Sequence, residues 1–287
     1  MINFIKKFIE TYKEKGLIEA FKKAKNKLLY MYKENTFKPY IITKKFADEE
    51  FKVLISDLFA QGWYDYHTEW PELVWLKENL LKEGDIVADC GANIGFTGLF
   101  FARCVGSTGK VIGFEALPAN AKVAWQNIRL NDVTNFEVKN VAVGAQKGVT
   151  KFTNHPNGSV GERDDMEVIE VTIISLDEVF VLEKPTFLKV DVEGHEIEVL
   201  KGARQVLQTR PKLDIEIHCC YFSERLNAVK EILELLHLSD YEAYIQLEVD
   251  GDIILFDTEK HTAELISRYN NVHLFAIPNI KYFLESF

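Results

Sequence analysis

From residue 86 onward, short apolar runs that resemble β-strands alternate with segments whose apolar residues recur at helical spacing. The runs Ile86–Ala88 and Phe187–Val190 are almost wholly apolar, as in strands that are covered on both faces. Such alternation predicts a mostly parallel sheet with helices on both faces. We expect strands at 86–90, 111–115, 136–143, 187–191, 213–218, 241–249 and 272–277, and helices at 94–105, 118–130, 195–208, 223–237 and 259–269.

Several segments depart from this alternation. Residues 148–153 and 168–174 look like extra strands around a polar loop at 154–165, and 241–249 with 253–256 looks like a hairpin. We therefore expect an α/β fold of seven main strands, with one antiparallel strand near the C-terminus. Ahead of this fold, Pro71 suits the first turn of a helix over 70–81, and 51–59 is predicted to be a short helix.

The N-terminal part of the chain differs in charge. Residues 1–45 contain twelve lysines and four glutamates, a net charge of +8, so the other 242 residues must carry −18 of the total of −10. Apolar residues lie at helical spacing on both sides of Gly16: Ile2, Ile5, Ile9 and Tyr12, then Leu17, Phe21, Ala24, Leu28 and Tyr32. We predict a basic amphipathic arm at 1–67 and a main domain at 68–287. Such an arm suits a cap on the main domain, an anionic membrane surface or a partner protein.

Composition excludes several classes of protein. An acidic main domain lacks the basic face of a nucleic-acid-binding protein. No apolar run approaches the roughly 18 residues that span a bilayer. The four cysteines form no C-x-x-C pair, and no cleavage site follows an apolar N-terminal core. These features predict a cytoplasmic protein, with peripheral contact at the inner membrane face through residues 1–45 if the arm binds lipid. A homo-oligomer is compatible with the sequence.

The turn D-C-G-A-N-I-G at 89–95 lies between an apolar strand and an apolar helix. This is where an open α/β sheet binds ligands, and Gly91 and Gly95 permit a tight turn and a close approach of backbone to ligand. Asn93 takes the place of the second glycine of the dinucleotide fingerprint, which disfavours a pyrophosphate. A nucleoside without a pyrophosphate, such as S-adenosylmethionine (SAM), remains compatible. Glu115 ends the next strand, 20 residues after Gly95, where an acidic side chain meets ribose hydroxyls in nucleotide-binding units.

A further segment indicates which family of nucleoside-binding proteins the chain resembles. The run K-V-D-V-E-G-H-E at 189–196, followed by L-K-G-A at 200–203, resembles the signature of the FkbM-type family of SAM-dependent methyltransferases. The glycine turn, F-E-x-L-P at 114–118 and E-I-H at 216–218 are also similar to that family. The resemblance spans about residues 68–280, with alanine and leucine between Glu115 and Pro118 as a departure from the commonest form.

The resemblance implies a Rossmann-like sheet of seven strands and methyl transfer from SAM to a hydroxyl of a sugar, glycan, glycolipid or related natural product. It implies that the methionine moiety of SAM is held by Asp89, Gly91, Asn93 and Gly95, with Asp191 nearby, that Glu115 holds the ribose, and that Asn140 and Ala142 flank the adenine. The acceptor would be a small molecule or a glycan, lipid-linked if the arm lies on a membrane.

Methyl transfer to an alcohol needs alignment of the hydroxyl with the methyl carbon and help in removing a proton. Candidate groups follow two neighbouring strands: Asp191, Glu193, His195 and Glu196 after the fourth, Glu216 and His218 at the end of the fifth. In one mechanism, His195 or His218 is the general base and a carboxylate orients it. In the other, Asp191, Glu216 and His218 bind a divalent cation, and oxygen-rich ligation favours Mg²⁺ or Mn²⁺.

Two other functions remain open from sequence alone. A nicotinamide oxidoreductase could share the fold, although Asn93 and the missing glycine spacing argue against it. A catalytically silent binding or scaffold protein could also keep the fold, although the intact Asp89, Glu115 and Asp191 argue against decay.

Overall fold

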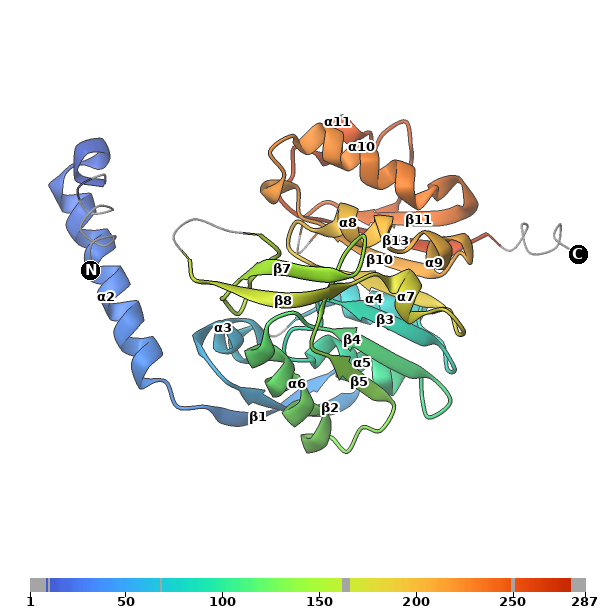
Figure 1. The fold of residues 1–287 in the computed structure, drawn as a ribbon, viewed down its shortest axis with the longest axis horizontal. Helices are drawn as coiled ribbons and strands as arrows, with labels where there is room; N and C mark the ends of the chain where they lie inside the picture. Colours follow the sequence, from blue (N-terminus) through green and yellow to red (C-terminus); the bar gives the residue numbers. More distant parts are fainter. Residues whose placement is uncertain (1–8, 10, 68, 162–165, 249–250, 280–287) are drawn as a thin grey trace, which may run out of the picture. The chain divides into compact units, whose positions relative to one another are not determined.

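The computed structural model describes residues 9, 11–67, 69–161, 166–248 and 251–279 (Figure 1). The chain divides into two compact units, one formed by residues 1–44 with 53–68 and the other by residues 45–52 with 69–287. Of the first predicted arm stripe, Ile2 and Ile5 lie outside the described residues, whereas Ile9 and Tyr12 lie within them. The second stripe lies on a helix, as predicted.

The first unit contains the helix α2 (Leu17–Thr36) and, after the strands β1 (Tyr40–Phe46) and β2 (Glu49–Ile55), the short helices α3 (Leu58–Ala60) and η1 (Gln61–Tyr66). β1 and β2 form a two-stranded sheet. The prediction of a helix over 51–59 is wrong. Phe51, Val53 and Ile55 are buried and the residues between them are more exposed, a period of two that belongs to a strand.

The tip of this hairpin, residues 45–52, belongs to the second unit because its aromatic residues pack there. The ring of Phe46 meets Trp70 edge-on with centroids 5.4 Å apart, and Phe51 meets Phe96 at 5.8 Å. Edge-to-face pairs of this kind stabilise a core by more than the burial of their apolar surface alone would. The tip is thereby fixed beside the helix that follows the glycine turn.

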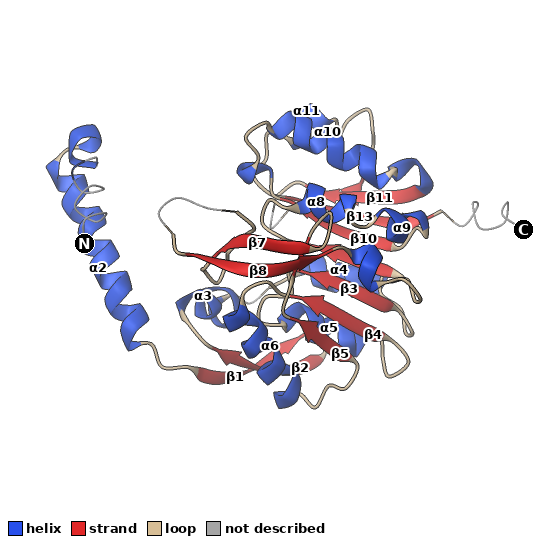
Figure 2. Cartoon of the chain, viewed as in Figure 1, coloured by secondary structure: helices blue, strands red, loops and turns tan. Residues whose placement is uncertain are grey.

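Within the described residues, the main sheet has eight strands in the order β12-β11-β13-β10-β9-β3-β4-β5. Figure 2 shows its strands in red, with helices in blue around them. The predicted α/β class is confirmed. The eighth strand, β12, adds two residues at one edge, and β13 runs antiparallel to both of its neighbours. The strands are β3 (Ile86–Cys90), β4 (Lys110–Phe114), β5 (Phe136–Lys139), β9 (Phe187–Val190), β10 (Lys212–Ile217), β11 (Tyr241–Gln246), β12 (Ile254–Leu255) and β13 (Val272–Pro278).

Helices cover both faces of this sheet. From β3, the chain adds β4 and β5 toward one edge of the sheet, and it then adds β9 and β10 on the other side of β3. Because the crossovers between parallel strands are right-handed, the helices of these two halves of the sheet lie on opposite faces. They are α4 (Pro71–Asn79), α5 (Phe96–Cys104), α6 (Pro118–Leu130), α7 (Leu176–Val179), α8 (Glu196–Lys201), α9 (Arg204–Gln208), η2 (Cys219–Tyr221), α10 (Arg225–Leu236), η3 (Leu238–Asp240) and α11 (Ala263–Ile266).

The helix predicted over 195–208 is divided into α8 and α9 at Gly202. A Cβ atom at Gly202 would lie 2.0 Å from the carbonyl oxygen of Gly144, so the chain passes too close to another segment for any side chain there. That segment belongs to a second, three-stranded sheet with the order β6-β8-β7, which contains both of the predicted extra strands. Its strands are β6 (Ala142–Val143), β7 (Gly148–Thr153) and β8 (Val168–Ile174).

Gly98 in α5 offers a test of this packing. A Cβ atom there would lie 2.1 Å from Cζ of Phe136. Alanine normally stabilises a helix interior relative to glycine by roughly 0.5–1 kcal/mol. We expect Gly98→Ala instead to lower the free energy of unfolding by about 1–3 kcal/mol, because the ring of Phe136 must move. Urea unfolding measures this change.

Gly62 is the matched control, since nothing lies within 4 Å of a Cβ atom built there. Gly62→Ala should be neutral or stabilising. An equal response of the two variants would contradict the packing described for α5.

Candidate functional site

The carboxyl ends of β3, β4, β9 and β10 meet at one edge of the sheet, as their parallel register requires. The N–H of Asp191 donates to the carbonyl of Cys90 at 3.0 Å, and the N–H of Gly91 donates to the carbonyl of Phe114 at 2.9 Å. Gly91 has φ +90°, and a Cβ atom on it would lie 1.7 Å from the carbonyl oxygen of Asp191. Only glycine can occupy this position, so the glycine turn and Asp191 form one continuous edge.

Asp89 is fully buried at the end of β3. Within the described part of the chain, neither of its carboxylate oxygens has a hydrogen-bond partner. Burial raises the pKa of Asp89 to about 6, although the ammonium of Lys189 lowers it. A buried carboxylate without hydrogen bonds is costly unless a ligand supplies them. This orphaned group is the clearest sign of a binding site at the predicted position.

Glu115 is also buried, but its carboxylate holds the turn together. One oxygen accepts the N–H of Asn93 at 2.8 Å and the other accepts the N–H of Leu117 at 2.7 Å. Burial raises the pKa of Glu115 to about 7 despite these two bonds. Each oxygen keeps a second lone pair for a hydroxyl donor. Asn93 has φ 48°, a left-handed conformation that asparagine tolerates better than most residues.

The residues predicted to flank adenine lie beside this element. The amide nitrogen of Asn140 donates to the carbonyls of Glu115 and Ala116, at 2.8 and 3.1 Å. Asn140 therefore braces the chain that carries Glu115. Ala142 is buried in β6, in a small apolar cluster with Leu117.

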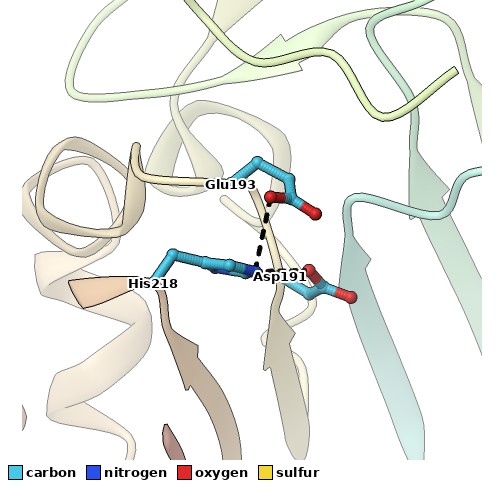
Figure 3. Close-up of side chains that lie close together, drawn as sticks. All are labelled: Asp191, Glu193 and His218. Atoms are coloured by element: carbon cyan, nitrogen blue, oxygen red, sulfur yellow. Dashed lines mark ion pairs between the residues drawn. The ribbon is translucent and has the colours of Figure 1, made fainter. Parts of the chain in front are cut away.

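His218 lies at the centre of a cluster of carboxylates (Figure 3). Its Nε2 is 3.3 Å from an oxygen of Glu216, 3.6 Å from Glu193 and 3.8 Å from Asp191. Its Nδ1 is 2.8 Å from Oε1 of Glu196, which is fully buried. The structure thus brings together predicted residues from the ends of two strands.

Glu196 sets the orientation of His218. Its Oε1 also accepts the N–H of Gly194 at 2.8 Å, so a backbone group holds the carboxylate in position independently of the imidazole. An ionised carboxylate accepts only, so Nδ1 of His218 carries a hydrogen and Nε2 faces the cluster. Burial favours the neutral ring, yet Glu216, Glu196 and Asp191 together raise the pKa of His218 to about 10.

Three groups in this cluster have the spacing of a metal site. One oxygen each from Asp191 and Glu193 and one nitrogen from His218 lie within 4.8 Å of one another. This set contains Glu193 rather than the predicted Glu216. Glu216 nevertheless lies in the cluster: its Oε1 is 3.3 Å from Nε2 of His218 and accepts the amide of Asn271 at 3.2 Å, while its Oε2 lies 3.4 Å from Nε2 of His273.

His195 lies elsewhere. It precedes α8, and a Cβ atom on Gly144 would be 3.1 Å from its Nε2, so its ring packs beside the three-stranded sheet. Burial lowers the pKa of His195. Its Nε2 is buried and has no hydrogen-bond partner among the described residues. Its predicted role as base therefore has less geometric support than that of His218.

A row of buried charges crosses the sheet, and it was not predicted from the sequence. Lys189 is paired in register with Asp89 on β3 and with Asp214 on β10, and its Nζ is 2.8 Å from Oδ2 of Asp191. Burial alone would lower the pKa of Lys189. The carboxylates of Asp191, Asp89 and Asp214 outweigh burial and raise that pKa above its usual value. The same cation keeps the pKa of Asp191 below its usual range despite burial. A lysine inside an otherwise apolar strand was the available signal.

A loop between β7 and β8 reaches the same edge. The carbonyl of Pro156 accepts the side-chain amides of Asn93 at 3.1 Å and Asn120 at 2.9 Å. Asn157 hydrogen-bonds Glu193, which partly offsets the rise in the pKa of Glu193 that burial causes. The described part of the predicted polar loop is therefore attached to both the glycine turn and the His218 cluster.

Lys189 can be tested by substitution. Lys189→Met leaves three carboxylates in the sheet without their shared cation, which should lower the free energy of unfolding at pH 7 by about 3–5 kcal/mol. The loss should shrink toward pH 5, because Asp89, with its raised pKa of about 6, then protonates in the folded state and no longer opposes folding. Lys201→Met, at a partly exposed pair with Glu198, should cost less than about 1 kcal/mol. Equal losses in the two variants would contradict the assignment.

Two family models, both of methyltransferases, match the chain. The family model described as the methyltransferase FkbM domain matches residues 89–243. A second model, that of protein-L-isoaspartate(D-aspartate) O-methyltransferase, matches residues 6–158. A SAM-dependent O-methyltransferase from Thermotoga maritima aligns with a TM-score of 0.45 and 17% identity, over 84% of this chain and 78% of that one.

Two curated relatives match the chain in part. The hexuronic acid methyltransferase AglP of Haloferax volcanii is 32% identical over 143 residues, which cover 48% of this chain and 57% of the relative. Methyltransferase 1 of Beauveria bassiana is 24% identical over 147 residues, covering 42% and 59% respectively. The chain thus spans less than two thirds of the length of either. Since the FkbM model covers more than half of the chain, including the glycine turn and the His218 cluster, the chain belongs to the FkbM methyltransferase family.

Proposed function

We propose that the chain transfers a methyl group from SAM to a hydroxyl of a sugar, in a free glycan or a glycolipid. The observation that carries the proposal is the continuous edge formed by the glycine turn, Glu115 and the His218 cluster. It offers a cofactor site and a group of proton-handling residues side by side. The hexuronic acid methyltransferase among the relatives supports a sugar as the acceptor.

The residues of the turn are suited to SAM. Asp89 offers two unpaired oxygens and a negative charge to the cationic cofactor. Gly91 and Asn93 keep the backbone in left-handed conformations that open the turn. The free lone pairs of Glu115 can accept the ribose hydroxyls. When bound, the cofactor supplies an activated methyl group; the residues here hold and orient it.

The acceptor hydroxyl must lose its proton, and His218 alone is poorly suited to take it at neutral pH. With a pKa raised to about 10, the imidazole is already protonated. A divalent cation held by Asp191, Glu193 and His218 would lower the pKa of the hydroxyl. Glu196 would then hold His218 through Nδ1, as carboxylates hold metal-binding histidines elsewhere. Two carboxylates and one imidazole favour Mg²⁺ or Mn²⁺.

Calorimetric titration tests the cofactor site. We expect SAM to bind with an affinity near micromolar, about −8 kcal/mol, and NAD not to bind. Asp89→Asn should weaken SAM binding at least tenfold, because it removes the buried negative charge and one of the two oxygens that have no partner in the protein. In the unsubstituted protein, affinity should fall as the pH drops below about 6, where Asp89 protonates. Glu115, with a pKa near 7, contributes in the same direction.

Asp177→Asn is the control, since that carboxylate accepts the N–H groups of Gln205 and Val206 away from this edge. Binding of NAD, or unchanged SAM affinity in Asp89→Asn, would defeat the cofactor assignment. SAM binding with no turnover on any sugar would instead support a silent binding protein.

Metal removal tests the proton-handling cluster. We expect chelator-treated protein to lose methyl transfer to a panel of hexuronic acids and glycans, and Mg²⁺ or Mn²⁺ to restore it. Electron paramagnetic resonance should detect one bound Mn²⁺, with affinity reduced at least tenfold in Glu193→Gln and His218→Ala. His237→Ala, at an exposed helix end, should leave binding unchanged.

A full rate after chelation, rising with pH toward about 10, would assign His218 as the general base without a cation. The cation proposal would then be wrong, while the proposed methyl transfer would stand.

A further inference from the structure

The helix α2 exposes apolar side chains to an extent that is unusual for a helix of a globular protein. Of its 20 residues, only Ala20 is buried. Leu17, Leu28 and Tyr32 expose 52%, 56% and 67% of their surface. Amphipathic helices of globular proteins normally bury such residues against a core.

Most of these side chains lie on one side of the helix. At 3.6 residues per turn, a single stripe contains Leu17, Ala20, Phe21, Ala24, Leu28, Met31 and Tyr32, with Asn35 near its C-terminal end. The rest of the helix surface contains Glu19, Lys22, Asn26 and Lys33 together with Ile18, Leu29 and Tyr30, and Lys25 and Lys27 flank the stripe on its two edges. Lysines at the edges of an apolar stripe can keep their ammonium groups in water while their stems lie along an apolar phase.

The net charge of the helix indicates which kind of surface is suited to cover this stripe. Residues 11–36 contain seven lysines and three glutamates, a net charge of +4, in a chain of net charge −10. The described helices include none that is long and apolar enough to cross a bilayer. A cationic helix with one apolar stripe is the form that lies in the plane of an anionic membrane interface.

We propose that α2 binds the surface of an anionic lipid bilayer, with its apolar stripe at the boundary of headgroups and acyl chains. Lysines on the flanks then face the anionic headgroups, and their attraction falls off within a Debye length. The inference goes beyond the proposed methyl transfer and does not depend on it. It also provides a physical reason for an acceptor that is itself held in a membrane.

Vesicle sedimentation of the full chain tests this proposal. We expect binding to vesicles of phosphatidylglycerol mixed with phosphatidylcholine, and binding about tenfold weaker to phosphatidylcholine alone or at high salt. Leu28→Glu with Met31→Glu places charges in the stripe and should reduce binding by about tenfold or more.

The matched control is Asn26→Glu with Tyr30→Glu, which changes the net charge equally on the polar side of the helix. It should reduce binding by only about the threefold to fivefold that two added charges cause at the surface. Circular dichroism checks that both variants keep α2, and SAM titration in solution reports the proposed methyltransferase site separately.

Three results would overturn the proposal. The first is an absence of sedimentation with anionic vesicles, and the second is an equal loss of binding in the two double variants. The third is self-association of the chain in analytical ultracentrifugation that Leu28→Glu with Met31→Glu abolishes, without vesicle binding, which would assign the stripe to a second copy of the chain.

Discussion

The ion pair between Lys189 and Asp191 is the interaction on which the rest of this site depends. Lys189 lies inside the sheet, in register with Asp89 and Asp214 on the neighbouring strands, and its Nζ contacts Asp191 at 2.8 Å. A buried lysine is tolerated only when carboxylates surround it. In return, its charge allows two acidic side chains to end adjacent strands without both becoming neutral.

This arrangement joins stability to function. The sheet places Asp89 where no protein group satisfies its oxygens, and it places His218 among more carboxylates than one imidazole neutralises. Both features cost folding free energy in the free protein. The proposed cationic cofactor at Asp89 and the proposed divalent cation at the His218 cluster would offset these costs. Charged groups without partners lower the stability of the free protein, and a ligand that pairs with them regains that free energy on binding. Such groups are typical of functional rather than structural residues.

Local patterns predicted the parts of the fold that depend on local order. Apolar runs indicated β3 and β9, and the glycine turn with Glu115 indicated the binding edge. The sequence did not predict features that depend on contacts between segments far apart in the chain. Gly202 divides a helix because Gly144 passes within van der Waals distance, and Pro156 reaches Asn93 across 63 residues. The sequence predicted that a carboxylate orients a histidine, but it did not identify Glu196 as the partner of His218, since that pair joins a helix to the end of another strand. Helical spacing at 51–59 concealed an alternation of period two.

The most direct test of the account is a crystal structure of the chain with S-adenosylhomocysteine, the demethylated product of the cofactor. The account predicts that its amino-acid portion lies against Asp89 and the glycine turn, that its ribose hydroxyls donate to Glu115, and that its sulfur faces the cluster of Asp191, Glu193 and His218. Density for the product at any other edge of the sheet, or with Asp89 still lacking a partner, would contradict it.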